Sequence, residues 1–187
     1  MKNIFNNIEK IMDQLSTTMY ILLILIFGFI YDTGCKITPK IHNLMDWMGR
    51  YRIINDRENK EPYLERYYLF LKDRQNFPFN IFIHKFLKSD PDDLHDHPWP
   101  YITIILKGGY WEYTYKDETK NVTIGEWKGP GSILYRSAES FHRIEIDENQ
   151  PATWTLFMPG KKMRDWGFQT NDGWIKNEDY LKIKKKY

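Results

Sequence analysis

The chain has 187 residues and a formal net charge of +2; 42% of its residues are hydrophobic and 17% aromatic. This length favours one domain with enough apolar residues for a core, and the near-balanced charge gives no reason to expect a nucleic-acid partner. The single cysteine, Cys35, excludes an intrachain disulfide framework. The abundance of tyrosine, phenylalanine and tryptophan favours β structure.

Residues 1–48 are predicted to form an N-terminal segment apart from the domain that follows. No charged residue lies between Asp13 and Asp32, and the run 19–31 is almost entirely apolar. A membrane anchor at about 15–31 would be at the short limit of the roughly 17–25 residues that span a bilayer. The basic residues after the run favour a cytoplasmic position for the rest of the chain. We therefore expect a single-pass anchor with a cytoplasmic domain, or otherwise a cytoplasmic protein.

Two other interpretations of the apolar run stay open. It would also suit a buried strand or helix of a soluble fold, although a core helix usually shows a polar face and this run shows none. A cleaved or lipidated signal is the third interpretation. Acidic residues disturb its basic start, and Asp32 stands where a lipoprotein signal requires an aliphatic residue.

From residue 49 onward the pattern changes to short strands separated by polar or Gly/Pro turns, after an amphipathic connector at 40–49. Strands are predicted at 51–54, 63–71, 80–87, 101–106, 110–115, 122–127, 132–135, 141–146 and 153–158, with a candidate last one at 165–169. The nearly continuous apolar run 101–106 predicts a strand buried on both faces. About ten short strands without a convincing helix indicate an all-β sandwich or barrel over residues 49–187.

Two of the five histidines, His95 and His97, are separated by one residue and precede the sequence Pro-Trp-Pro. Alternate side chains of an extended strand share a face, so both imidazoles should point the same way. His142 lies in a later predicted strand. Three imidazoles that met would hold a divalent transition metal and leave positions for water or substrate. Taken alone, the H-x-H pattern would favour polar loop residues that cap a turn before Pro98.

The spacing around these histidines resembles the two motifs of the cupin superfamily, the small jelly-roll β-barrels. The first motif, H-x-H followed by a glutamate and then a glycine, matches His95, His97 and Gly108, but Tyr101 stands where the family has its glutamate ligand. The second motif runs from a glycine to a histidine and matches in spacing up to His142, with other residues in place of its Pro and Gly. The resemblance implies an all-β, cupin-type jelly-roll barrel behind the hydrophobic N-terminal helical segment. It also implies a metal at the three histidines.

Most of residues 49–180 further resemble a group of uncharacterised bacterial, phage and viral cupin-like proteins. The likeness lies in the segment 95–100, the Gly-Gly-Tyr-Trp-Glu sequence at 108–112, and the aromatic stretches at 154–157 and 166–174. It brings no known substrate with it. Cupins include isomerases, oxygenases, storage proteins and sensors, so the fold alone does not select a function.

A cupin site with three histidines and no carboxylate resembles that of the thiol dioxygenases, which bind Fe(II). We therefore expect Fe(II) first, with Mn, Ni or Zn as alternatives, and our first functional hypothesis is an Fe(II)-dependent oxygenase acting on a small molecule. One alternative is a non-catalytic module that binds a small molecule or sugar. Another is a structural, for instance viral, protein. The expected partners are a small-molecule substrate or ligand, a membrane through the N-terminal segment, and a second copy in a homodimer.

Several other side chains are candidates for the site. Tyr101 shares strand parity with His97, so its phenol either enters the site as a catalytic acid, base or donor, or packs in the core. Glu112 either replaces the missing carboxylate ligand or is an exposed charge on its strand. The predicted pocket lining consists of Trp99, Thr103 and Ser140.

Three further expectations concern the surroundings of the site. His84 lies in a predicted strand between aromatic residues, where a packed, hydrogen-bonded histidine is more common than a ligand. Asp96 should point away from its two histidine neighbours and either support them or lie on the surface. The aromatic residues of 166–174 should cover an open edge of the barrel.

Overall fold

A computed structural model describes residues 38–184 except 57–58, 75–76, 92, 117–122, 148 and 150–151. The predicted membrane anchor at about 15–31 lies outside these residues. Within the described part, no helix combines the length and the apolar character needed to cross a membrane.

Most of the described chain is β structure, and its elements follow the predicted order. They are α2 (Thr38–Trp47), β1 (Tyr51–Asn55), β2 (Pro62–Tyr68), β3 (Phe82–Phe86), β4 (Leu94–His95), β5 (Tyr101–Lys107), β6 (Tyr110–Tyr115), β7 (Thr123–Lys128), β8 (Ile133–Arg136), β9 (His142–Ile146), β10 (Trp154–Pro159), β11 (Gly167–Thr170), β12 (Gly173–Lys176) and α3 (Asn177–Lys184).

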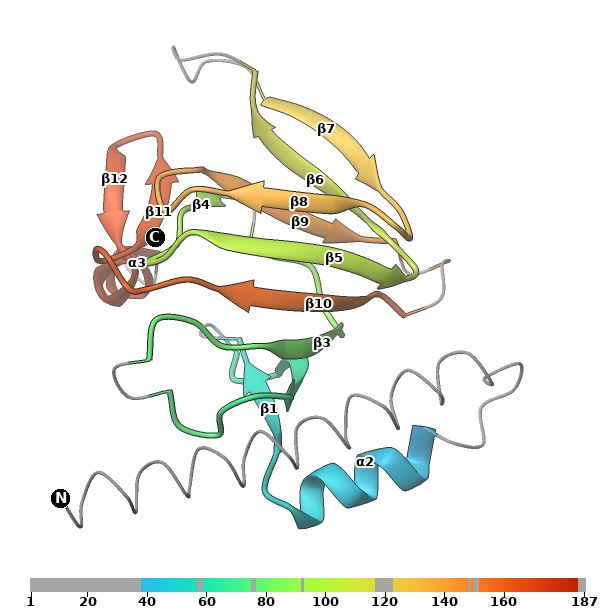
Figure 1. Cartoon of the computed structure of the whole chain (residues 1–187). Helices are drawn as coiled ribbons and strands as arrows, with labels where there is room; N and C mark the ends of the chain where they lie inside the picture. The colour runs from blue at the N-terminus through green and yellow to red at the C-terminus, as the bar shows by residue number, and fades with distance from the viewer. Residues whose placement is uncertain are drawn as a thin grey trace, which may run out of the picture.

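The strands form two antiparallel sheets of six strands each (Figure 1). The first sheet has the order β1-β2-β3-β10-β5-β8, and the second has the order β12-β11-β4-β9-β6-β7. Within them, β3 to β10 divide into β3-β10-β5-β8 and β4-β9-β6-β7, an arrangement consistent with a jelly roll, which packs eight strands in two sheets. Among the described residues the two sheets do not close into one barrel, so the predicted jelly-roll barrel takes the form of a two-sheet structure.

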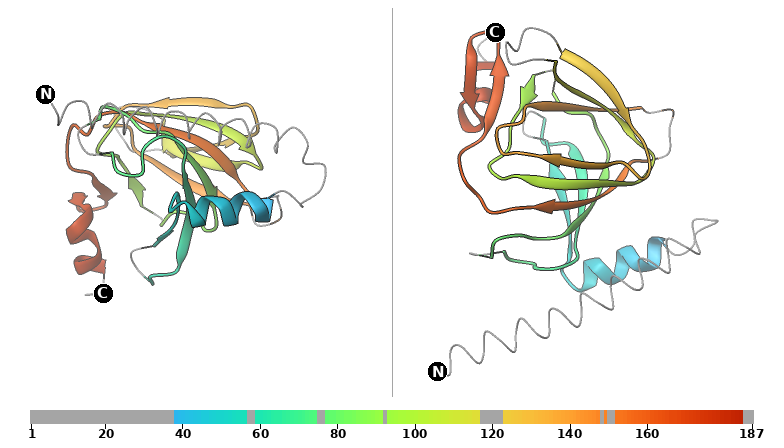
Figure 2. Two further views of the ribbon diagram at one scale, coloured as in Figure 1. Left: turned by 60° about the horizontal axis from the view of Figure 1, so that its bottom comes forward. Right: turned by 45° about the horizontal axis from the view of Figure 1, so that its top comes forward.

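The helices lie at opposite ends of the sheets. The amphipathic connector becomes α2, which contacts β1, whereas α3 contacts β11 and β12 (Figure 2). Met45 of α2 is buried in one cluster with Tyr67, Leu69 and Ile83 on the outer face of the first sheet. A second cluster between the sheets joins both of them; it contains Leu64, Phe86, Ile105, Tyr110 and Ile144. The first sheet is therefore buried on both faces near α2.

Strand β5 differs from the prediction for residues 101–106. Tyr101, Thr103 and Ile105 are buried, but Ile102 between them is 37% exposed. This strand lies one place from the edge of the first sheet, next to β8. Because an antiparallel sheet can leave one face in water, the apolar outer residues of β5 do not require a second packed layer.

The C-terminal part contains two elements that the sequence pattern did not predict, β12 and α3. Strands β11 and β12 form a hairpin in which Thr170 pairs with Gly173. Glu178 and Asp179 occupy the first turn of α3, where negative charge stabilises a helix. Tyr180 is buried and stacks on the Phe168 ring at 3.9 Å between centroids. Because the composition of the tail is basic, the sequence pattern did not predict that Tyr180 would be buried.

Candidate metal centre

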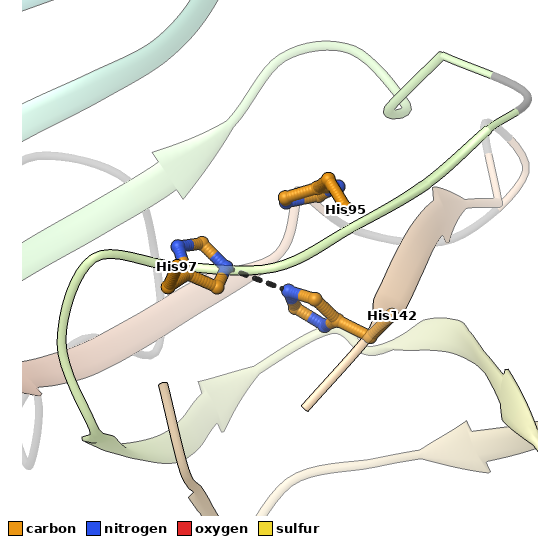
Figure 3. Close-up of side chains that lie close together, drawn as sticks. All are labelled: His95, His97 and His142. Atoms are coloured by element: carbon orange, nitrogen blue, oxygen red, sulfur yellow. Dashed lines mark hydrogen bonds between the residues drawn. The ribbon is translucent and has the colours of Figure 1, made fainter. Parts of the chain in front are cut away.

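The three histidines that were predicted as ligands lie together. Strand β4 pairs with β9 so that His95 and His142 are cross-strand neighbours, and His97 follows two residues later. One ring nitrogen from each of the three residues lies within 4.8 Å of the other two. Figure 3 shows the three rings, with Nε2 of His97 and Nε2 of His142 2.8 Å apart. We call these three residues the histidine cluster.

The histidine cluster fits a single metal ion. Two nitrogens that each lie about 2.1 Å from one ion are about 3 Å apart at a right angle, which is close to the 2.8 Å between His97 and His142. Nδ1 of His95 is buried and has no hydrogen-bond partner among the described residues. A set of imidazoles suits iron, zinc, copper or nickel.

Two of the histidines, His95 and His97, are in the protonation state that a metal requires. Burial lowers the pKa of His95, Asp90 opposes this shift and the neighbouring His142 adds to it, so that the resulting pKa is about 4. Burial also lowers the pKa of His97 well below its usual value, with added repulsion from the other two rings. Both rings are therefore neutral at pH 7, and the neutral imidazole is the form that binds a metal.

Glu112 supports His142. Its side chain is buried, and Oε1 lies 3.1 Å from Nδ1 of His142, the ring nitrogen that does not face His97. Arg136 donates to both carboxylate oxygens. Burial raises the pKa of Glu112, but the bonds to His142 and Arg136 outweigh this effect and hold the pKa below its usual value. The carboxylate therefore keeps the proton of His142 on Nδ1 and leaves Nε2 for a metal.

The two expectations for Glu112 thus need correction. It is not an exposed charge, because only 2% of the residue is accessible. It is also not part of the histidine cluster, since its carboxylate is engaged by His142 and Arg136. Its parity explains this position: Tyr110 and Glu112 point inward from β6, whereas Trp111 between them is 42% exposed.

Tyr101 both packs in the core and reaches the histidine cluster. Its ring centroid lies 4.8 Å from that of His97 and 5.1 Å from that of Phe157. Its hydroxyl lies 3.1 Å from Nε2 of His142. Burial, with the negative charge of Glu112, raises the pKa of Tyr101 well above its usual value. The phenol therefore stays protonated near neutral pH and acts as a hydrogen-bond donor.

Asp96 fastens the histidine segment to the C-terminal hairpin. It is fully buried and points away from its histidine neighbours, as the strand parity predicted. Oδ1 accepts a hydrogen bond from the backbone nitrogen of Gly167 at 2.7 Å, and Oδ2 accepts one from Nε1 of Trp174 at 3.1 Å. Arg164 lies 3.1 Å from the same Oδ2. The alternative of a surface position for Asp96 is therefore wrong.

Asp90 was not identified from the sequence. Its Oδ2 accepts a hydrogen bond from the backbone nitrogen of Ile144 at 2.7 Å, and its Oδ1 accepts one from the hydroxyl of Tyr63. The same Oδ2 lies 3.9 Å from Nδ1 of His95. In the sequence this aspartate belongs to an acidic loop, which gives no signal that one of its carboxylates is buried.

A cavity of about 430 Å³ opens between the sheets and includes the histidine cluster. Of the predicted pocket residues, Trp99 and Thr103 line it, and so do Tyr101 and Glu112. Ser140 is not among the lining residues, because its hydroxyl bonds the backbone nitrogen and hydroxyl of Ser137 within the turn before β9. Strand parity alone could not show that the Ser140 hydroxyl is bonded within this turn.

The remaining aromatic and histidine predictions divide in the same way. Trp166 and Phe168 line the cavity, whereas Trp174 is 40% exposed and binds Asp96 instead. His84 is a packed, hydrogen-bonded residue outside the histidine cluster, as predicted: its ring stacks on Phe157 at 4.9 Å. Arg66 and Thr155 also line the cavity, although no motif in the sequence marks them; their inward positions on β2 and β10 were the available signal.

No family model and no curated protein sequence matches this chain. Solved structures do match it, and they include cupin-fold proteins. A cupin-2 domain from Rhodospirillum rubrum is 14% identical, with 66% of this chain and 78% of that chain covered and a TM-score of 0.48. The chain resembles cupin-fold proteins. These structural neighbours are cupin-fold proteins, the group that the two histidine motifs resemble.

Two further structures illustrate the range of these matches. A protein of unknown function with a cupin-like fold from Ralstonia eutropha is 17% identical, with coverage of 74% of this chain and 83% of that chain and a TM-score of 0.46. The Fe(II) form of HppE is 10% identical, with coverage of 59% and 57% and a TM-score of 0.45. This chain thus spans little more than half of HppE. These likenesses concern the fold alone.

Proposed function

We propose that this chain is a metalloprotein of cupin-like fold that binds a divalent transition metal at His95, His97 and His142 and acts on a small molecule in the adjoining cavity. The observation that carries the proposal is the convergence of three largely buried imidazoles on one point at the cavity. The metal that we propose is Fe(II), and the reaction class is the oxygen-dependent oxidation of a small molecule. Mn, Ni and Zn are the alternatives to iron.

Each residue around the cluster has a defined task in this proposal. Fe(II), when bound, would supply the redox chemistry, and three neutral ligands would leave its double positive charge uncompensated. Glu112 holds the proton of His142 on Nδ1, which keeps the ring in the orientation and tautomer that metal binding needs. Tyr101 presents a protonated hydroxyl beside the cluster and can donate a hydrogen bond to a substrate oxygen. The aromatic lining limits the access of water.

A non-catalytic binding module is the second candidate. It is favoured by the cavity itself, which is lined by aromatic rings from both sheets, as ligand-binding cavities usually are. Such a module would retain its ligand after the histidines are replaced, whereas an enzyme of the proposed kind would lose its activity.

The proposal is tested by the metal content of the full chain, purified without a histidine tag and measured by mass spectrometry. The wild type, a His95→Ala/His142→Ala variant and a His84→Gln control are compared, since His84 is also buried but lies outside the cluster. We expect near-stoichiometric Fe, Mn, Ni or Zn in the wild type and the control, and at least a tenfold loss in the double variant.

Two results would contradict the proposal. One is a wild type that holds no metal even after anaerobic loading with Fe(II). The other is a double variant that holds as much metal as the wild type. Once metal binding is established, oxygen consumption in a screen of small molecules separates the enzyme from the binding module.

A further inference from the structure

The wall of the cavity on the first sheet carries a row of three polar side chains. Strand pairing places Arg66 of β2 opposite His84 of β3, and His84 opposite Thr155 of β10. All three residues line the cavity that contains the histidine cluster. The proposed metal chemistry uses none of them, so their polarity needs another explanation.

Arg66 carries a charge that has no counter-ion among the described residues. Its Nε donates a hydrogen bond to Nε2 of His84 at 2.9 Å, and its guanidinium lies 4.7 Å from the centre of the Phe82 ring. Burial lowers the pKa of Arg66, and interactions with the Tyr68 hydroxyl only partly oppose this effect. An arginine remains charged even so. A partly buried cation without a counter-ion is costly unless something else compensates its charge.

The carboxylates of the cavity do not compensate Arg66. Three acidic side chains line the cavity among the described residues, and each is engaged elsewhere. Asp56 is paired with Lys88, and Glu112 is paired with Arg136. Asp90 accepts hydrogen bonds from Tyr63 and from the backbone of β9. The positive charge of Arg66 is therefore available to a ligand.

Thr155 gives an independent indication of a missing partner. Only 1% of this residue is exposed, and its Oγ1 has no hydrogen-bond partner among the described residues. A buried hydroxyl without a partner destabilises the fold, because it has lost its hydrogen bonds to water. Thr153, two residues earlier and equally buried, satisfies its hydroxyl through the backbone of Gly109. Unsatisfied buried hydroxyls are thus not general in this part of the chain.

We propose that Arg66, held in place by His84 and assisted by Thr155, forms an oxyanion subsite that binds a carboxylate or phosphate group of the cavity ligand. The guanidinium presents a fork of donors that matches either group. This inference deepens the proposed function, because it assigns the proposed substrate to the class of small molecules with an anionic end.

The position of the subsite also limits the shape of the ligand. His84 stacks on Phe157, Phe157 contacts Tyr101, and Tyr101 contacts His97, with ring centroids 4.9, 5.1 and 4.8 Å apart. Two aromatic rings therefore separate the subsite from the histidine cluster. A ligand that used both would have an apolar or aromatic middle, with its oxyanion at one end and the reacting group at the other.

The subsite is tested by calorimetric titration of the metal-free full chain with benzoate, inorganic phosphate and benzamide at constant ionic strength. Benzamide is the neutral counterpart of benzoate. We expect at least one of the two anions to bind, and benzoate to bind at least tenfold more tightly than benzamide if it is that anion. The Arg66→Gln change should weaken anion binding at least tenfold, and Thr155→Val should weaken it a few-fold. Arg66→Lys keeps the charge but loses the fork, so its affinity should be intermediate.

Arg52→Gln is the matched control, because Arg52 is the cross-strand neighbour of Arg66 on β1 but is exposed. The affinity of this variant for the anion should be within twofold of the wild-type affinity.

Three results would overturn the proposal. The first is that neither anion binds to the wild type, and the second is that benzoate is the only anion bound and benzamide binds as tightly. The third is that the Arg66 variants bind the anion with the affinity of the wild type. Metal is removed for these titrations, so a failure of the metal site leaves their result interpretable. Conversely, the metal content of the Arg66→Gln protein should equal that of the wild type.

Discussion

The two sheets face one cavity, but they satisfy their buried polar groups differently. On the second sheet, Nδ1 of His142 donates a hydrogen bond to Glu112, and Arg136 of β8 on the first sheet pairs with the same carboxylate. On the first sheet, Arg66 has only uncharged groups as described partners, and Thr155 has no hydrogen-bond partner there. Polar groups of the cavity wall whose hydrogen bonds are all made within the protein are suited to fix a metal ligand. Polar groups of the wall that lack such bonds are suited to bind a polar group of a ligand.

The largest effect should come from breaking the bonded network around Glu112. Glu112→Gln leaves Arg136 without its buried carboxylate and weakens the support of His142. We expect a loss of about 3 kcal/mol in the free energy of unfolding and a fall of about 10–100-fold in metal affinity. Urea unfolding and metal titration measure the two effects. Glu126→Gln, in the exposed pair with Lys128, should cost less than about 1 kcal/mol; equal costs would refute the comparison.

The second effect concerns pH, and it tests whether buried histidines of both sheets stay neutral. The pKa of His95 is about 4 in the folded chain against 6.5 as the ordinary value, and burial also places the pKa of His84 well below that value. Between these values only the unfolded chain gains a proton, so stability should fall as the pH decreases from 6.5 towards 4. For His95 alone the loss at pH 5 is on the order of 2 kcal/mol.

This loss is measured by urea unfolding of the metal-free protein at several pH values. Replacing His84, on the first sheet, with Gln should make the unfolding free energy depend less on pH. Replacing His95, on the second sheet, with Gln should have the same effect. A pH dependence that neither substitution changes would show that these rings are not held neutral by burial.

The smallest effect compares two buried threonines with the same substitution. Thr155→Val removes a hydroxyl that has no described partner, so the unfolding free energy of the ligand-free protein should rise by about 1 kcal/mol. Thr153→Val removes a hydroxyl that bonds the backbone nitrogen and oxygen of Gly109, so the unfolding free energy should fall by about 1–2 kcal/mol. Changes of the same sign in the two variants would contradict the distinction between satisfied and unsatisfied groups.

Local periodicity was sufficient for much of the fold. Strand-like runs between turns identified β6 and β10, and the H-x-H spacing identified two members of the histidine cluster. It failed at β5, where an apolar run of isoleucines suggested two buried faces although Ile102 is partly exposed. It also failed at β12 and α3, where Tyr180 of α3 stacks on Phe168 of β11.

The support of the site was harder to foresee than its ligands. A histidine motif has a fixed spacing, whereas the partners of Asp90 and Glu112 come from distant segments. Glu112 meets Arg136 only because β5 and β8 lie beside each other in the first sheet and face β6 across the interior. No periodicity within one strand reports a contact between two sheets. The roles proposed for Arg66 and Thr155 could not be predicted for the same reason. They depend on the absence of bonding partners in the folded structure, which the sequence does not show.

Strand β4 has a consequence for the order of events during synthesis. It contains two residues, pairs with β9 through the single pair His95–His142, and is bordered on its other side by Phe168 of β11. A ribosome that has delivered His95 and His97 has not yet supplied His142 or the hairpin that Asp96 binds. We therefore expect the metal to be captured after residues 167–176 have left the ribosome. A nascent chain arrested before them should be unable to retain the ion.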